Sequence, residues 1–164
     1  MNEMMKIILL TILPNKVAEI FSHTPSCDLR LIDIDNKNLS KQTVLRRLEQ
    51  QLAEGADYLF TYRCPIMIPA ELYRKAEKGA YNIHPYLLPQ YPGVNPWRDL
   101  LAHHEKESGI TIHCLADAYD AGEVVCQSHF PIDEKIDSIK LREQSDVEAA
   151  SLVSDFLMTI NNMM

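Results

Sequence analysis

The stretch Lys6-Ile-Ile-Leu-Leu-Thr-Ile-Leu13 decides the fold class, because it is apolar without alternation and has the length of a strand. Such a run fits a strand that is buried on both faces, as in a parallel sheet covered by helices. It is far shorter than the roughly 20 residues that a membrane-spanning helix needs. No small-residue cleavage site follows it, so we expect neither a secretory signal nor a membrane partner.

Strand-length runs alternate with helical patterns along the rest of the chain. The pattern predicts further strands at 29–34, 58–62, 80–84, 110–115 and 124–130. It predicts helices at 15–23, 40–55, 69–79, 96–104 and 147–160. This alternation indicates one Rossmann-like α/β domain over residues 1–164, with a mostly parallel sheet and helices on both faces. In such sheets, ligands bind beyond the carboxyl ends of the strands.

The composition excludes several classes of protein. The 164 residues are 46% apolar and 24% charged, which is ordinary for a folded domain, and the net charge is −7. The acidic excess lies in residues 83–164 and disfavours a nucleic-acid partner. The four cysteines have neither zinc-like nor C-x-x-C spacing, so we expect reduced thiols in a cytoplasmic protein and no metal site: Cys27, Cys64, Cys114 and Cys126.

Glycine does not occur in the first 54 residues. The turn after the first strand therefore cannot be a Gly-rich phosphate loop, which disfavours dinucleotide dehydrogenases and nucleotide triphosphatases. A phosphate on the substrate would have to be held by side chains or by a helix N-terminus outside a glycine loop. Arg63 follows the third strand directly and is the best-placed basic residue, although a solvated arginine at a strand end is an equally good interpretation.

The fourth strand ends in Asn82-Ile-His84, which places an amide and an imidazole on one face. This pair suits carbonyl chemistry, because the amide can hydrogen-bond a developing oxyanion while the imidazole moves a proton. Two internally bonded polar residues that close a strand are the alternative. A carboxylate after the fifth strand, such as Asp120, would raise the pKa of His84 or relay its proton, unless it only bends the chain. His113 is expected to be a half-buried strand residue.

Four motifs in order resemble the catalytic core of the folate-dependent formyltransferases over about residues 58–132. They are Asn82-Ile-His84-Pro85, Leu87-Leu-Pro89-x-Tyr91-x-Gly93, Gly109-Ile-Thr-Ile-His113, and Asp120-Ala-Gly122 with Val124-Val-x-Gln127. That family includes glycinamide ribonucleotide, methionyl-tRNA and amino-sugar formyltransferases and 10-formyltetrahydrofolate hydrolases. The resemblance implies transfer of a formyl group from 10-formyltetrahydrofolate to the amine of a small acceptor, without a metal.

The resemblance also implies which residues act. Asn82, His84 and Asp120 would form the catalytic triad. The folate would lie between two segments and contact mainly their backbone: Ile66 and Met67 on one side, and Leu115, Ala116, Asp117, Ala118 and Tyr119 on the other. Arg63 and Tyr86 are the residues that we expect beside the acceptor.

The chain departs from the family pattern in its N-terminal half, which is shortened. Relatives usually carry an additional β-α segment between the second and third strands, and the glycine-containing phosphate turn is missing here. The acceptor therefore stays open, with an amino sugar among the candidates. A hydrolase that uses water as the nucleophile and a non-catalytic folate-binding module are alternatives. The sequence sets no oligomeric state, and a homodimer stays open.

Overall fold

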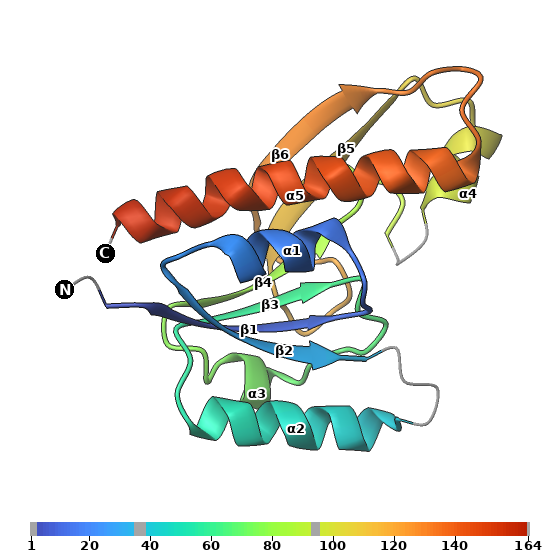
Figure 1. Cartoon of the computed structure of the whole chain (residues 1–164). Helices are drawn as coiled ribbons and strands as arrows, with labels where there is room; N and C mark the ends of the chain where they lie inside the picture. Colours follow the sequence, from blue (N-terminus) through green and yellow to red (C-terminus); the bar gives the residue numbers. More distant parts are fainter. Residues whose placement is uncertain (1–2, 35–38, 93–95, 164) are drawn as a thin grey trace.

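The first apolar run forms the central strand β1 (Met5–Thr11) of a six-stranded sheet in the computed structural model (Figure 1). The structure describes residues 3–34, 39–92 and 96–163. Lys6 is the exposed residue of β1, and the other six are buried. The sheet order is β2-β1-β3-β4-β5-β6, and the remaining strands are β2 (Cys27–Asp33), β3 (Tyr58–Tyr62), β4 (Gly79–His84), β5 (Glu107–Cys114) and β6 (Val124–Pro131).

The sheet is mostly parallel, as the sequence predicts. Strands β2, β1, β3 and β4 run parallel, whereas β5 pairs antiparallel with β4 and β6 pairs antiparallel with β5. A parallel neighbour requires a crossover over one face of the sheet. In its described part, the segment after β4 contains one short helix, α4 (Trp97–Ala102), which packs against the last helix. The chain then enters β5 from the end of the sheet at which β4 finishes. That return makes β5 antiparallel.

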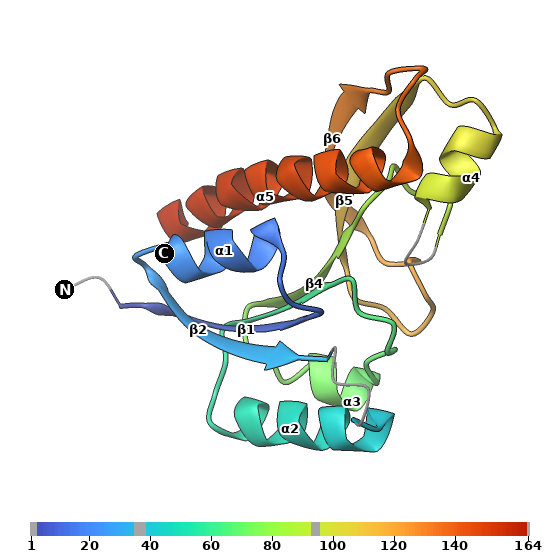
Figure 2. The ribbon, with the colours of Figure 1, turned by 45° about the vertical axis from the view of Figure 1, so that its right-hand side comes forward.

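Helices cover both faces of the sheet, as predicted (Figures 1 and 2). Helices α1 (Lys16–His23) and α5 (Ser138–Asn162) cover one face, and α2 (Lys41–Ala53) and α3 (Ala70–Tyr73) cover the other. Side-chain caps fix the starts of α1 and α2, because Asn15 Oδ1 accepts from Ala18 N and Ser40 Oγ accepts from Thr43 N.

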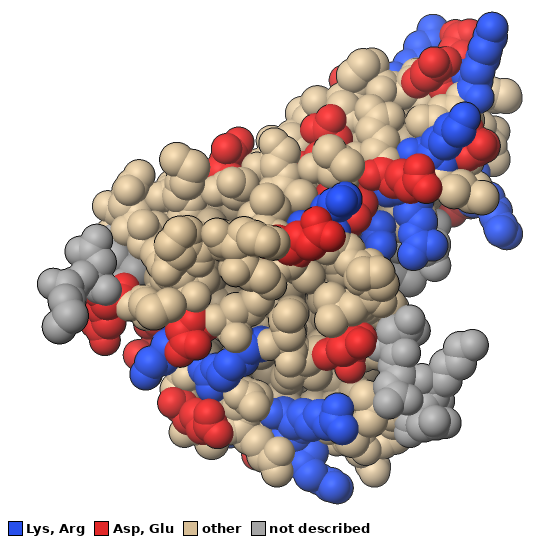
Figure 3. All heavy atoms as spheres, viewed as in Figure 1, with Lys and Arg blue, Asp and Glu red and all other residues tan. Residues whose placement is uncertain are grey.

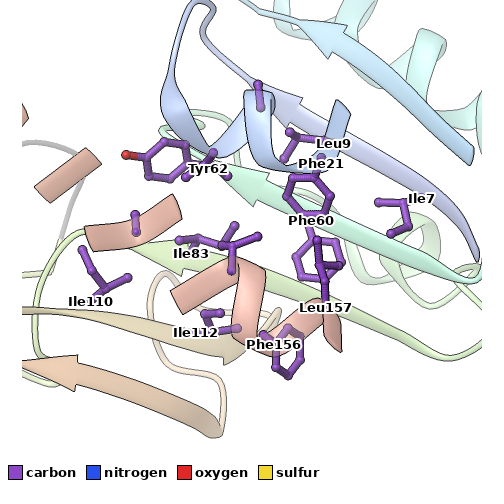
Figure 4. Close-up of a cluster of buried hydrophobic side chains, with 14 of the residues drawn as sticks. Ile7, Leu9, Phe21, Phe60, Tyr62, Ile83, Ile110, Ile112, Phe156 and Leu157 are labelled. Atoms are coloured by element: carbon purple, nitrogen blue, oxygen red, sulfur yellow. The ribbon is translucent and has the colours of Figure 1, made fainter. Parts of the chain in front are cut away.

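Aromatic packing joins the sheet to the helices on the α1 and α5 face (Figure 4). The ring of Phe60 in β3 lies 5.0 Å from Phe21 of α1 and 6.1 Å, edge to face, from Phe156 of α5. Trp97 is 4% exposed and belongs to the same core. This rigid centre fixes the carboxyl ends of β1, β3 and β4, where the polar residues collect.

Two predicted helices have different bounds in the structure. The helix expected at 69–79 is only α3, because the backbone N–H groups of Glu77 and Lys78 bond to the carbonyls of Ala56 and Asp57 instead of continuing a helix. The last helix begins at Ser138 instead of Val147. Its first turns are polar and lack the apolar stripe that marks the later part, and Asp137 caps it by accepting from Lys140 N.

The surface in one view carries charges of both signs, and the cysteine state agrees with the sequence analysis. On the face seen in Figure 3, lysine and arginine side chains are interspersed with aspartate and glutamate. All four cysteines are free thiols. In the described part of the chain, no helix combines the length and the apolar character needed to span a bilayer.

Candidate active site

Asn82 occupies the centre of a polar row across three strands. The pairing of β3, β4 and β5 places Thr61 on one side of Asn82 and His113 on the other. Thr61 Oγ1 donates to Asn82 Oδ1 at 2.8 Å, and Asn82 Nδ2 lies 3.0 Å from His113 Nε2. The second nitrogen of His113, Nδ1, lies 2.9 Å from the carbonyl oxygen of Cys114 and must therefore donate. Because Asn82 Oδ1 accepts from Thr61, the amide nitrogen of Asn82 is the atom that faces Nε2, and the two neighbours together fix the orientation of the amide.

The loop between β5 and β6 brings Asp120 to this row. Asp120 has a φ of 51°, in the left-handed region that aspartate tolerates better than most residues. Two residues later, Gly122 packs so closely that a Cβ atom would overlap the carbonyl oxygen of Cys114. The loop can therefore reach its position only with glycine at 122.

Asp120 contacts three polar side chains at once. Its Oδ2 lies 3.6 Å from His84 Nδ1, and its Oδ1 lies 3.4 Å from both His113 Nε2 and Asn82 Nδ2. The structure thus brings Asn82, His84 and Asp120 together, as expected, and adds His113. The side chains of His84 and Asp120 are only 2% and 3% exposed, and Asn82 is half-buried.

Burial decides the charge of His84. Desolvation lowers the pKa of His84 below its usual value and outweighs Asp120 and the Tyr91 carbonyl, both of which raise it. Asp120 raises the pKa of His84, as expected, but desolvation is the larger effect. His84 Nε2 lies 3.1 Å from the Tyr91 oxygen, which only accepts, so Nε2 carries the hydrogen. The lone pair of neutral His84 on Nδ1 then faces Asp120.

A cleft of about 580 Å³, part of it open to solvent, extends from this cluster. Its lining includes most of the residues expected to contact the folate: Ile66, Met67, Leu115, Ala116, Ala118 and Tyr119. The Tyr119 hydroxyl donates to the Cys64 carbonyl at 3.1 Å and joins the two walls. A cleft of this size and apolar character is typical of small-molecule sites.

Two of the expected contact residues lie outside this lining. Asp117 Oδ1 accepts from the Tyr73 hydroxyl at 2.9 Å, and a backbone contact between Asp117 and folate stays a prediction. Tyr86 is 2% exposed, and its hydroxyl points to the Glu107 carbonyl at 3.4 Å. Its position in the core does not support the expected contact with the acceptor.

Arg63 lines the cleft, as expected of an acceptor residue, but it is already paired. Its Nη2 lies 3.6 Å from Asp146 Oδ1, and the two side chains are 12% and 13% exposed. The guanidinium also lies over the rings of Tyr62 and Trp97, at 5.2 Å and 5.8 Å from their centroids. Arg63 is therefore a fixed part of the wall and not a solvated arginine.

The sequence analysis missed the roles of His113, Thr61 and Asp146. His113 and Thr61 follow from the strand neighbours and register, and His113 also requires that β5 run antiparallel to β4. Asp146 belongs to a helix far along the chain, and no local pattern connects it with Arg63. Among the described residues, no group of three histidine, cysteine, aspartate or glutamate side chains is arranged to hold a metal ion.

Comparison with known proteins assigns the chain to a family. Residues 9–155 match the family model described as formyl transferase. The chain belongs to the formyl transferase family. Within it, the chain is 31% identical over 110 residues to the methionyl-tRNA formyltransferase of Listeria monocytogenes. That match covers 67% of this chain but only 35% of the relative, so the chain spans about a third of the relative's length.

Solved structures confirm the formyl transferase fold. A formyltetrahydrofolate deformylase from Pseudomonas syringae pv. tomato has a TM-score of 0.83 and 14% identity, over 98% of this chain and 62% of that chain. A Mycobacterium tuberculosis protein thought to be a sugar N-formyltransferase has a TM-score of 0.78 and 19% identity, over 97% of this chain and 68% of that chain. At these identities the likeness shows the fold alone.

Proposed function

We propose that this formyl transferase family member moves a formyl group from 10-formyltetrahydrofolate to the amine of a small acceptor. The observation that carries the proposal is the cluster of Asn82, His84 and Asp120, which lines the cleft. The apolar walls of the cleft suit a flat heterocycle, and Ile66 and Met67 line it together with residues of the loop after β5. When bound, 10-formyltetrahydrofolate supplies the electrophilic formyl carbon.

Each residue of the cluster has a different role in the proposed reaction. Asn82 is oriented by Thr61 and His113, and its second amide N–H makes only the long 3.4 Å contact with Asp120 Oδ1. This N–H exchanges that contact for the formyl oxygen as the oxygen gains negative charge. Neutral His84 accepts a proton at Nδ1 from the attacking amine. The imidazolium that forms lies between the Asp120 carboxylate and the Tyr91 carbonyl, and both stabilise its positive charge. It then gives the proton to the folate nitrogen as the bond from that nitrogen to the formyl carbon breaks, so that tetrahydrofolate leaves as a neutral amine.

Hydrolysis is a second candidate, because the same cluster can accept a proton from water as readily as from an amine. The deformylase has the same fold at a TM-score of 0.83, which is compatible with this alternative. Formyl transfer needs an amine acceptor besides the formyl donor, whereas hydrolysis needs only water. A non-catalytic folate-binding module would need the cleft but no turnover.

The test incubates the chain with 10-formyltetrahydrofolate, with and without a panel of small amines, and measures tetrahydrofolate, formate and formylated amine. We expect tetrahydrofolate to appear only with an amine. Formate release without any amine would replace transfer by hydrolysis. Folate binding seen by calorimetry without either product would leave only a binding module.

The matched variants are His84→Ala and His104→Ala. His84→Ala should reduce the rate on the order of 10²-fold, because it removes the proton acceptor. His104 is exposed at the end of α4, outside the cleft lining, and its variant should keep wild-type turnover. Urea unfolding of both variants separates loss of chemistry from loss of folding. Wild-type turnover in folded His84→Ala would contradict the assigned mechanism.

A further inference from the structure

The carboxylate of Asp146 contacts the N-terminus of α1 and the guanidinium of Arg63. Both groups would otherwise attract an anion. Its Oδ2 accepts a hydrogen bond of 2.9 Å from the backbone N–H of Lys16, the first residue of α1. Its Oδ1 accepts from the Tyr62 hydroxyl at 2.7 Å and lies 3.6 Å from Arg63 Nη2. At 13% exposure, the Asp146 side chain is weakly screened by water and salt.

These contacts leave no positive group near Asp146 free to bind a ligand anion among the described residues that line the cleft. Helix N-termini and arginines are the groups that commonly bind phosphate and carboxylate. Among the described residues that line the cleft, Arg63 is the only lysine or arginine. Asp146 compensates both Arg63 and the N-terminus of α1 with one internal negative charge. A phosphate at this edge would have to displace Asp146 or meet its repulsion.

Arg63 is also not the phosphate anchor that the sequence suggested. Its guanidinium lies over the rings of Tyr62 and Trp97, and the Asp146 carboxylate balances its charge. Its Nε is buried from solvent and cannot donate to a ligand in this conformation. A cation that is already paired with a carboxylate gains little from a second anion, so this wall suits a neutral group better than a phosphate.

We propose that Asp146 determines acceptor specificity by excluding anionic groups, so that the acceptor is an amine without phosphate or carboxylate near the reacting nitrogen. A neutral, hydroxyl-bearing molecule such as an unphosphorylated amino sugar has this chemistry. The acceptor class rests on the proposed function, whereas the exclusion of anions by Asp146 does not. Asp146 touches no reacting atom, and it acts by pairing Arg63 and the N-terminus of α1.

The first arm of the test measures binding of inorganic phosphate to the whole chain by calorimetry, with chloride at equal ionic strength as the blank. The variants are Asp146→Asn and Asp155→Asn, which remove the same charge from the same helix, the second at an exposed position. Asp146→Asn should bind phosphate at least about tenfold more tightly than wild type, as an anion at a helix N-terminus would. Asp155→Asn should behave as wild type. Wild type that binds phosphate as tightly as Asp146→Asn would overturn the proposal.

The second arm compares an amino sugar with its phosphate ester as acceptors for the wild-type chain. We expect kcat/KM to favour the unphosphorylated sugar by at least about tenfold and Asp146→Asn to narrow that ratio. Equal or better use of the phosphate ester by wild type contradicts the proposal even if the Asp146 variant does not fold. If neither sugar is formylated, the acceptor class is wrong, and the phosphate titration still decides the role of Asp146.

Discussion

Asp120→Asn tests the electrostatic part of the site, because it removes the charge that faces His84 while keeping the shape of the side chain. Unit charges at the 3.6 Å separation of Asp120 Oδ2 and His84 Nδ1 attract by about 5 kcal/mol at an effective dielectric constant of ~20. Relaxation of the loop and entry of water will recover part of this energy. We therefore expect the rate of formyl transfer to fall on the order of 10²- to 10³-fold, or about 3–4 kcal/mol.

The same variant should move the pH profile in a defined direction. The pKa of His84 is already below its usual value because of desolvation, and Asp120 is the largest contribution that raises it. Loss of that charge lowers the pKa of His84 further. Since neutral His84 is the proton acceptor, the acid limb of kcat/KM should move to lower pH while the plateau falls.

The assay follows tetrahydrofolate release between about pH 5 and 8, the range in which a histidine titrates. Glu123→Gln is the control, because it removes an exposed charge three residues along the same loop. Glu123→Gln should leave the acid limb of kcat/KM at the same pH and the plateau of kcat/KM within about twofold of wild type, as expected of a surface position. An unchanged plateau in Asp120→Asn, or an acid limb that moves to higher pH, would refute the reasoning.

Two further predictions concern the scaffold that positions the cluster. Gly122→Ala should destabilise the chain by about 1–3 kcal/mol in urea unfolding and reduce turnover at least tenfold, because its Cβ would overlap the Cys114 carbonyl and displace Asp120. Ala121→Ser, at the neighbouring exposed position, should change neither quantity, and equal effects would contradict the steric argument. Ser145→Ala should cost about 1–3 kcal/mol of unfolding free energy, because it leaves the buried Nε1–H of Trp97 without the 3.0 Å bond to Ser145 Oγ. Ser151→Ala, on the exposed side of α5, is its control, and a loss below about 0.5 kcal/mol for Ser145→Ala would show that Trp97 finds another partner.

Much of the fold could be predicted from sequence because the strands carry local signals. The Lys6–Leu13 run indicates a strand covered on both faces, and β1 is such a strand. Ser40 lies directly before α2 and caps it, since capping involves residues that are close together in the chain. Pro69 lies directly before α3, where its missing N–H costs no helical hydrogen bond. The extent of α3 could not be predicted, because distant carbonyls before β3 take the N–H groups that a longer helix would use.

The sequence by itself determined the fold class. Through the order of its motifs it also predicted that Asn82, His84 and Asp120 belong to one site. Short-range spacing and the alternation of strand and helix carry that information. The tertiary structure alone decided that β5 returns antiparallel, which places His113 beside Asn82. It alone decided the neutral state of His84, because desolvation depends on everything that packs around the ring. The pairing of Arg63 with Asp146 likewise joins residues 83 positions apart, and only the packing of α5 over β3 and α1 brings their charges within reach.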